Sequence, residues 1–308
     1  MANPRHSTPL AGARVLVTGA TGRVGAPIAR TLAETNVVYG VARFTDPTGP
    51  ARLEAAGVIP VPADLGRVDV ATLPDVEYVF HAGAALGRDA TDWRWAFEVN
   101  AHAAGRLVAR YRDARGFVYC STGSVYAYQG PRPLREDDPP GVHLGVYSLS
   151  KIAGEAVVGF AARQWDVPTT IIRIFSTYGP LGGAPADRLD RLLTRKDIRL
   201  HPDRPNRYNP IYEDDYVALG VRALLAGTVP AQVVNWAGSE TVSAEAYCEY
   251  LGELVGITPQ FVYTDTTYTP LWADVQRMHE VLGPTTVPWR EGMRRMLEAR
   301  HPGLARLR

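Results

Sequence analysis

The sequence predicts an α/β protein with a Rossmann-type doubly wound parallel sheet and a smaller, mostly helical C-terminal substrate lobe. Two observations support this fold class. Short runs of β-branched and aliphatic residues alternate with amphipathic segments through the first half of the chain, which is typical of a parallel sheet covered by helices. The first run leads directly into a glycine-rich turn at residues 14–25, RVLVTGATGRVG, as expected where a strand of such a sheet meets its helix.

The remaining elements follow from the hydrophobic pattern. Residues 14–18 are expected to form a buried strand because apolar residues run there without alternation. Further strands are expected at residues 37–42, 58–62, 78–81, 116–120 and 233–236. Helices are expected to begin near Arg23 and to span residues 91–113, 146–164, 214–225, 243–255, 271–282 and 289–299. Residues 181–210 lack clear periodicity and crowd Pro, Arg and Asp, which predicts an irregular insertion that covers a substrate.

These elements divide the chain into three expected parts. Residues 1–13 form a flexible N-terminal tail, residues 14–174 a dinucleotide-binding core, and residues 175–308 a substrate-binding lobe. Segments such as 211–236 are expected to return from the lobe to the core.

The composition of the chain indicates which partners it is expected to bind and in which cellular compartment it is expected to lie. Thirty-three basic and thirty-two acidic residues leave a net charge of +1, which argues against binding to nucleic acid or to an anionic membrane. No apolar stretch is long enough for a membrane span or a signal peptide, so a soluble, cytoplasmic protein is expected. Cys120 and Cys248 are too few for a disulfide framework, and the seven histidines lack metal-ligand spacing, so no metal site is expected.

The glycine-rich turn has the spacing that a dinucleotide pyrophosphate requires. Gly19 allows a tight turn, Gly22 allows backbone to approach phosphate, and Gly25 allows close packing of helix on strand. The following helix directs free N–H groups at the phosphates. The residues expected to bind cofactor in this turn are Gly19, Thr21, Gly22, Arg23, Val24 and Gly25. The alternative is an ordinary glycine-rich turn.

The end of the second strand bears on the choice between NAD and NADP. A carboxylate at this point binds the ribose 2′-hydroxyl of NAD, but the chain has Arg43 there. Because a guanidinium pairs with a 2′-phosphate, the sequence favours NADP and leaves NAD possible. The alternative is a solvated surface arginine.

Two later strand ends are expected to complete the cofactor site. Asp64 and Leu65 follow the third strand and are placed to meet the adenine. The small residues Ala82, Gly83 and Ala84 follow the fourth strand and let backbone pass close to a ligand. His81, just before them, is expected to be a packed core histidine.

A tyrosine and a lysine four residues apart supply candidate acid–base chemistry. Tyr147 and Lys151 share one face of the predicted helix 146–164. An ammonium close to a phenol favours the phenolate, which lets a tyrosine exchange protons near neutral pH. Thr122, at the end of the fifth strand, is placed to hold the same substrate oxygen. The alternative reading of Lys151 is a surface residue in a salt bridge.

The chain resembles the extended short-chain dehydrogenase/reductase family, which includes nucleotide-sugar epimerases and dehydratases. The resemblance is carried in order by TGATGRVG at 18–25, Asp64-Leu65, HAGAA at 81–85, Val99-Asn100, STGSVY at 121–126, YSLSK at 147–151 followed by Glu155, RIFSTYGP at 173–180 and RYNPIYEDD at 207–215.

The resemblance implies roles for particular residues. Thr122, Tyr147 and Lys151 would form the catalytic triad, with Tyr147 and Lys151 also at the cofactor. The resemblance implies cofactor contacts for Asn100, which supports the active site, and for Phe175. It implies substrate contacts for Thr122, Ser124, Ser176 and Arg207.

Three departures from the family pattern bear on the reaction. The dehydratases carry Asp-Glu after the catalytic Thr, whereas this chain has Gly123 and Ser124, which disfavours a 4,6-dehydratase. Ser176 replaces an Asn that contacts the sugar nucleotide, and no arginine occurs between Phe261 and Gln276. Six arginines are available to neutralise a diphosphate: Arg188, Arg191, Arg195, Arg199, Arg204 and Arg207.

These observations predict an NAD(P)-dependent oxidoreductase or epimerase that transfers hydride at a secondary alcohol or ketone, with a nucleotide sugar or related carbonyl compound as substrate. One alternative is a carbonyl reductase of a non-nucleotide small molecule. The alternative from another class is a non-catalytic dinucleotide sensor.

A homodimer is also expected, because helices 91–113 and 146–164 carry more apolar surface than one sheet face covers. The resemblance points the same way, because members of that family pair these helices into a four-helix bundle. The residues concerned are Trp93, Trp95, Phe97, Leu149, Ile152, Ala156 and Phe160.

Overall fold

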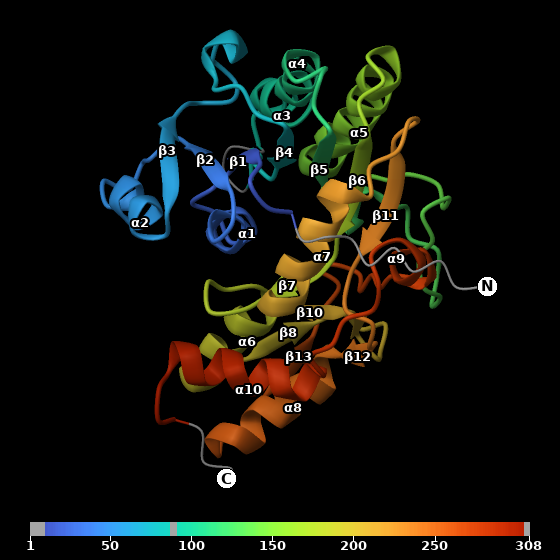
Figure 1. Cartoon of the computed structure of the whole chain (residues 1–308). Coiled ribbons are helices and arrows are strands. Elements are labelled where there is room, and N and C mark those ends of the chain that lie inside the picture. Colours follow the sequence, from blue (N-terminus) through green and yellow to red (C-terminus); the bar gives the residue numbers. More distant parts are fainter. Residues whose placement is uncertain (1–9, 87–90, 305–308) are drawn as a thin grey trace, which may run out of the picture. The chain divides into compact units, whose positions relative to one another are not determined.

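The largest element of the protein is a seven-stranded parallel sheet (Figure 1). The computed structural model describes residues 10–86 and 91–304. Strand order across the sheet is β3, β2, β1, β4, β5, β6, β11. The strands are β1 (Arg14–Thr18), β2 (Val37–Ala42), β3 (Val58–Pro62), β4 (Tyr78–His81), β5 (Gly116–Thr122), β6 (Thr169–Ile174) and β11 (Gln232–Trp236). Because the order reverses between β1 and β4, the carboxyl ends of these strands flank the crevice where doubly wound sheets bind ligands.

The sheet confirms the predicted fold class. Strands β1 to β4 occupy their expected ranges, and β5 extends to Thr122, beyond the expected end at Cys120. Strand β6 is absent from the sequence-based prediction, although five of its six residues are β-branched and its first four are buried.

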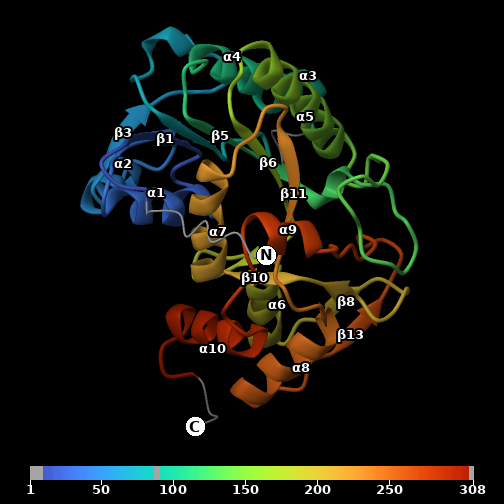
Figure 2. The same ribbon diagram turned by 45° about the vertical axis from the view of Figure 1, so that its right-hand side comes forward.

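Helices flank the sheet between successive strands. They are α1 (Gly25–Ala33), α2 (Gly49–Ala55), α3 (Trp93–Phe97), α4 (Ala103–Arg110), α5 (Val146–Gln164) and α7 (Glu213–Leu225). Helix α5 has the predicted bounds and packs along α3 and α4, as Figure 2 shows. Helix α1 begins at Gly25 rather than near Arg23.

The long helix expected over residues 91–113 is interrupted. A π-helical turn, Glu98–His102, separates α3 from α4, and α4 ends at Arg110. The reason lies at Asn100, whose carbonyl oxygen accepts a hydrogen bond from the hydroxyl of Tyr119 at 2.7 Å. A hydrogen bond from outside the helix competes for this carbonyl, and π-turns of this kind are frequent at functional sites.

Two compact units can be distinguished along the chain. The first comprises the residues up to Ser121, 145–172 and 217–233; the second comprises 122–144, 173–216 and 234–308. Each unit has its own apolar core. The first core is centred on residues such as Leu16, Val79 and Phe117, and the second on residues such as Leu189, Tyr247 and Met293.

The second unit combines helices with three small two-stranded sheets. The sheets pair β7 (Ser176–Tyr178) with β10 (Pro210–Tyr212), β9 (Arg207–Tyr208) with β12 (Val242–Ser243), and β8 (Ile198–Leu200) with β13 (Phe261–Tyr263). The helices are α6 (Ala184–Leu193), α8 (Ala244–Val255), α9 (Gln276–Val281) and α10 (Trp289–Arg300). Helices α8 and α10 pack together (Figure 1). Ser243 caps α8, because its hydroxyl accepts a hydrogen bond from the Ala246 amide.

Two predictions for this unit are wrong. The segment 181–210 was expected to be irregular but contains α6, whose Leu189 and Leu192 are buried, as well as β8. The helix expected over 271–282 is limited to α9, because residues 272–274 run extended and hydrogen-bond to Leu134.

The predicted flexible tail falls mainly on residues 1–9, which lie outside the described residues. Residues 10–13 are anchored rather than free. The Gly12 amide donates to the carbonyl of Thr35 at 2.8 Å, and the Ala13 amide donates to the side chain of Asn36 at 3.1 Å.

Candidate active site

The glycine-rich turn brings backbone atoms closer together than a side chain would permit. Gly19 has a φ of +67°, and a Cβ there would lie 2.9 Å from the amide nitrogen of Gly83. A Cβ on Gly25 would lie 2.3 Å from the carbonyl oxygen of Gly19. The first glycine therefore makes the turn and the third allows the close packing, as their spacing predicts.

The amino-terminal end of α1 follows this turn and carries no side-chain cap. Val24, which precedes the helix, makes no side-chain cap, and the Ala26 amide donates to the carbonyl of Gly22 at 3.0 Å. The positive end of the helix dipole suits the pyrophosphate of a dinucleotide. Arg23 and Val24 lie in this turn but do not line the cavity beside it.

A cavity of about 220 Å³ opens beside the turn within the first unit. Most of its wall comes from the carboxyl ends of β1 to β4. The predicted cofactor residues that line it are Gly19, Thr21, Gly22, Arg43, Asp64, Leu65, Ala82, Gly83 and Ala84. The sequence analysis missed Val41, Ala42, Ala63, Ala85, Leu86, Trp95 and Val99. The glycine-rich turn at Gly19 and Gly22 borders this cavity and leaves no room for a Cβ at Gly19. Such a turn suits the phosphates of a dinucleotide.

Trp95 is placed differently from the prediction. It was assigned to a dimer face, but its indole lines the cavity and lies against Gly66, where a Cβ would come within 2.4 Å of the ring. The guanidinium of Arg67 lies 5.3 Å from the ring centroid. The helical period correctly places Trp95 on the apolar face of its helix. The period does not say what the indole packs against, and the contact with Gly66 decides this.

His81 is a packed core histidine, as expected. It is 1% exposed, and its Nδ1 lies 2.7 Å from the hydroxyl of Thr18, which accepts a hydrogen bond from the Gly83 amide. Burial lowers the pKa of His81 to about 3, with a smaller effect from the charge of Lys151. The ring is therefore neutral at physiological pH.

Asn100 joins the loop after β4 to helix α5. Its side-chain oxygen accepts from the Ala85 amide at 2.8 Å, and its Nδ2 donates to the Ala85 carbonyl and to Ser150 Oγ at 3.2 and 2.9 Å. Ser150 Oγ in turn donates to the carbonyl of Tyr147 at 2.8 Å. Asn100 does not line the cavity; it fixes backbone on both sides of the first unit's site.

Lys151 is fully buried in the first unit. It is 2% exposed, and its Nζ lies 4.3 Å from the ring centroid of Tyr119. Burial lowers the pKa of Lys151 to about 8, and the neighbouring Cys120 and Glu155 partly oppose this effect. Tyr147 lies one turn earlier in the same helix. The alternative of a surface lysine in a salt bridge is therefore wrong.

The candidate substrate residues of the second unit begin directly after Ser121. Thr122 Oγ1 accepts a hydrogen bond from the Ser124 amide at 3.2 Å and lies 3.1 Å from Ser124 Oγ. These bonds fix the turn in which both hydroxyls lie.

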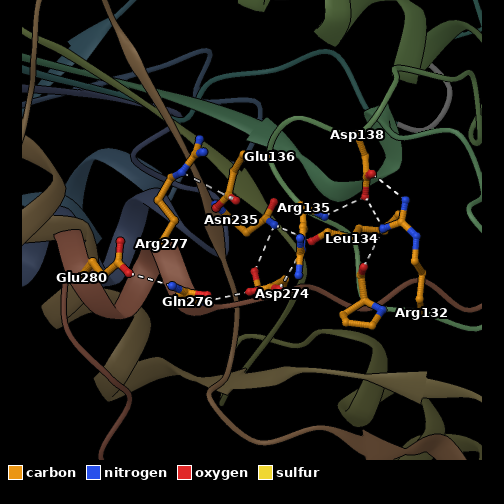
Figure 3. A network of polar contacts seen from close by, with 11 residues as sticks. Arg132, Leu134, Arg135, Glu136, Asp138, Asn235, Asp274, Gln276, Arg277 and Glu280 are labelled. Carbon is orange, nitrogen blue, oxygen red and sulfur yellow. Dashed lines mark hydrogen bonds and ion pairs between the residues drawn. The ribbon is translucent and has the colours of Figure 1, made fainter.

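A polar network anchors the segment that follows this turn (Figure 3). Asn235 donates to the carbonyls of Leu134 and Asp274 at 2.8 and 3.1 Å, and its oxygen accepts from the hydroxyl of Tyr126 at 2.5 Å. The Asn235 amide donates to Glu136 at 2.8 Å. Burial raises the pKa of Glu136. The sequence does not indicate this network, because the hydrogen-bonded residues are 39 to 109 positions apart.

Phe175, Ser176 and Arg207 also belong to the second unit. The ring of Phe175 packs on Gly123, where a Cβ would lie 2.8 Å away. Ser176 begins β7. The half-buried guanidinium of Arg207 lies 5.5 Å from the ring centroid of Trp272. Within residues 10–86 and 91–304 it makes no salt bridge or hydrogen bond, so its donors remain available to an anion.

Two of the other arginines available for a diphosphate also contact the fold itself. Arg188 donates to the hydroxyl of Tyr247 and packs on Tyr208, beside the second core. Arg191 donates to the carbonyl of Asp197 at 2.7 Å. Each of these two guanidiniums therefore uses part of its donors within the protein.

Two further features concern metals and membranes. Among the described residues no group of three or more His, Cys, Asp or Glu side chains is arranged to hold a metal ion. In the same part of the chain, no helix combines the length and apolar character of a membrane span. Cys120 and Cys248 are free, buried thiols.

Comparison with known proteins identifies the family. Residues 15–236 match the model of the NAD dependent epimerase/dehydratase family. This match covers most of the chain, which therefore belongs to that family and is an enzyme of the extended short-chain dehydrogenase/reductase type.

Individual relatives agree with this assignment. The "Uncharacterized UDP-glucose epimerase YtcB" of Bacillus subtilis (strain 168) is 25% identical over 298 residues, which cover 87% of this chain and 92% of the relative. "UDP-glucuronate 4-epimerase 4" of Arabidopsis thaliana is 28% identical over 56% of this chain and 43% of its own length.

A solved structure shares the fold. The UDP-glucuronic acid 4-epimerase of Bacillus cereus, in complex with UDP-glucuronic acid and NAD, superposes with a TM-score of 0.81. The two chains are 22% identical over 93% of this chain and 98% of the other.

Proposed function

We propose that this enzyme is an NAD(P)-dependent epimerase of nucleotide sugars, which inverts a secondary alcohol through a ketone. The observation that carries the proposal is the fully buried Lys151 one turn after Tyr147, in the unit that also contains the glycine-lined cavity. The names of the relatives support a UDP-sugar as substrate.

Each proposed catalytic residue has a defined task. Tyr147 removes the proton from the sugar hydroxyl and later returns it to the ketone oxygen. The Lys151 ammonium favours the phenolate of Tyr147. Thr122 donates a hydrogen bond to the same substrate oxygen. A bound dinucleotide would supply reversible hydride transfer at the sugar carbon.

The cofactor contacts predicted from the sequence remain proposals. Backbone at Gly19, Gly22 and Gly25 would hold the pyrophosphate, and Asp64 and Leu65 would meet the adenine. Further proposed contacts come from Thr21, Arg23, Val24, Ala82, Gly83, Ala84, Asn100, Tyr147, Lys151 and Phe175.

The choice between NAD and NADP depends on Arg43. This residue lines the cavity at the end of β2, where no carboxylate is present. The structural relatives were solved with NAD, and that observation favours NAD. The preference for NADP predicted from the sequence rests on Arg43 alone.

Arg207 is proposed to bind the substrate diphosphate, while Ser124 and Ser176 contact the sugar. The support is a half-buried cation whose donors are not used by the described part of the chain. A guanidinium in this state is suited to phosphate oxygens. The two alternatives, a non-nucleotide carbonyl reductase and a dinucleotide sensor, lack support from the relatives.

Thermal unfolding tests the nucleotide part of the proposal. A ligand at 100 times its dissociation constant adds about 2.7 kcal/mol to the free energy of unfolding. With the dinucleotide present, UDP at millimolar concentration is expected to raise the melting temperature of the wild type and of Arg112→Ala, an exposed control outside the proposed diphosphate arginines, but not of Arg207→Ala. An equal shift in all three proteins would refute the role of Arg207, and no shift with UDP, dTDP or GDP would favour a carbonyl reductase.

A homodimer and a cytoplasmic location remain proposals. Trp93 on α3 and Leu149 and Phe160 on α5 are 57%, 45% and 70% exposed. Apolar side chains this exposed on two adjoining helices support pairing with a second copy of the chain.

A further inference from the structure

The ammonium of Lys151 lies in the interior without a salt bridge to a carboxylate. Within the part of the chain that the structure describes, its Nζ makes no salt bridge or hydrogen bond. Glu155, one turn further along α5, has its Oε1 2.5 Å from the hydroxyl of Ser121, which donates to it. A buried ammonium needs compensation for its lost hydration, and the closest recorded contact of Nζ is the face of Tyr119, at 4.3 Å from the ring centroid.

The other groups facing Lys151 offer little charge. His81 on β4 is neutral, because burial lowers its pKa to about 3. Cys120 on β5 is a neutral thiol, because burial raises its pKa to about 12. On α5 itself, Glu155 favours the ammonium electrostatically, and Tyr147 lies one turn before it. The ring face of Tyr119 is therefore a close contact that favours the charged form, together with Glu155.

The ring of Tyr119 is held rigidly. It is fully buried, and its hydroxyl donates to the carbonyl of Asn100 at 2.7 Å. Gly154 of α5 lies against the hydroxyl, and a Cβ there would come within 2.0 Å of it. The ring of His81 is 5.7 Å away between centroids. The ring face is thus fixed before any ligand binds.

We propose that Tyr119 is a positioning residue: its ring face holds the Lys151 ammonium in place and keeps it charged, so that Lys151 can act on Tyr147. The inference rests on the proposed role of Tyr147 and Lys151. A cation on a desolvated aromatic face is stabilised by the ring quadrupole. Because Tyr119 has its own hydrogen bond, it does not exchange protons with Lys151; burial raises the pKa of Tyr119 well above its ordinary value.

The lysine content of the chain makes the test direct. Lys151 and Lys196 are its only lysines, and Lys196 is exposed. NMR of protein carrying ¹³C-labelled lysine therefore gives two titrating signals, and Lys196 serves as an internal reference. The titration is done on the full chain without substrate.

Three variants separate the ring face from the hydroxyl. Tyr119→Leu removes the ring and is expected to lower the pKa of Lys151 by about one unit, from the usual size of a desolvated cation–π contact. Tyr119→Phe keeps the ring and is expected to change the pKa much less. Phenylalanine with one to three ring fluorines, placed at position 119, keeps the shape but weakens the quadrupole, and is expected to lower the pKa in steps.

The fluorinated series keeps the proposal testable even if Tyr119→Leu does not fold. A Lys151 pKa that stays constant through the fluorinated series would refute the cation–π contact. Because the titration needs no turnover, an inactive Tyr119 variant with unchanged Lys151 titration would count against this inference alone. Failure of the wild type to epimerise any sugar would count against the proposed function and leave the titration result standing.

Discussion

Two glycines in helix α5 allow the packing around Lys151 to be tested by substitution. Gly154 and Gly159 both lie in the helix interior, where replacing Gly by Ala normally stabilises by about 1 kcal/mol. They differ in surroundings: a Cβ on Gly159 meets nothing within 4 Å, whereas a Cβ on Gly154 would lie 2.0 Å from the Tyr119 hydroxyl and 2.4 Å from the Asn100 carbonyl oxygen.

Opposite effects on stability follow from this difference. We expect Gly159→Ala to increase the free energy of unfolding by about 0.5–1 kcal/mol. Gly154→Ala must displace Tyr119 or the helix, which costs about 1–3 kcal/mol in overpacking. It also breaks the Tyr119–Asn100 hydrogen bond and leaves buried polar groups unpaired, at about 1–3 kcal/mol more. After the gain in helix propensity, a net loss of about 1–5 kcal/mol remains.

Thermal unfolding of the two variants beside the wild type is the assay. One kcal/mol corresponds to a change in melting temperature of about 2–4 °C for a protein somewhat smaller than this one. The two variants are therefore expected to differ by several degrees, with the wild type between them. If Gly154→Ala melts together with Gly159→Ala, the close contact of α5 with Tyr119 and Asn100 does not exist.

Three further predictions concern Lys151, the cofactor and the assembly. Burial lowers the pKa of Lys151 from 10.5 to about 8, so its ammonium opposes folding by about 3 kcal/mol below pH 8. Lys151→Met should therefore be more stable than the wild type at pH 7. In urea unfolding, this gain in the free energy of unfolding should decrease as the pH rises from 8 to 10.5. A gain that is independent of pH would contradict this account. Arg43→Ala should weaken NADPH binding more than NADH binding in calorimetry, and an equal loss would show that Arg43 does not read the 2′ position. Light scattering at micromolar concentration should give twice the mass of one 33.6 kDa chain. Phe160→Glu should shift the protein to the monomer. A monomeric wild type would refute the proposed dimer.

The pattern of strands and glycines predicted the sheet because each of these features depends on residues that are close together in the sequence. A buried strand followed by Gly19, Gly22 and Gly25 fixes the turn through contacts within a few residues. The pair Tyr147 and Lys151 was found for the same reason, since one helix sets their spacing.

Long-range contacts explain what the sequence did not indicate. The π-turn at Asn100 depends on a hydrogen bond from Tyr119, and the position of Trp95 depends on Gly66. The extended course of residues 272–274 depends on Leu134 and Asn235. In each case the helical period of the segment was correct or ambiguous, and a partner many residues away decided the backbone.

The central claim is that the enzyme inverts a sugar carbon through a ketone by transferring hydride within one active site. The most direct measurement is proton NMR of UDP-glucose or UDP-glucuronate incubated in D₂O with the protein and NAD. The 4-epimer is expected to appear without deuterium at the inverted carbon and without net reduction of cofactor, and Tyr147→Phe is expected to slow the conversion about 100-fold or more. Deuterium at the inverted carbon, net accumulation of reduced cofactor, or wild-type conversion by Tyr147→Phe would contradict it.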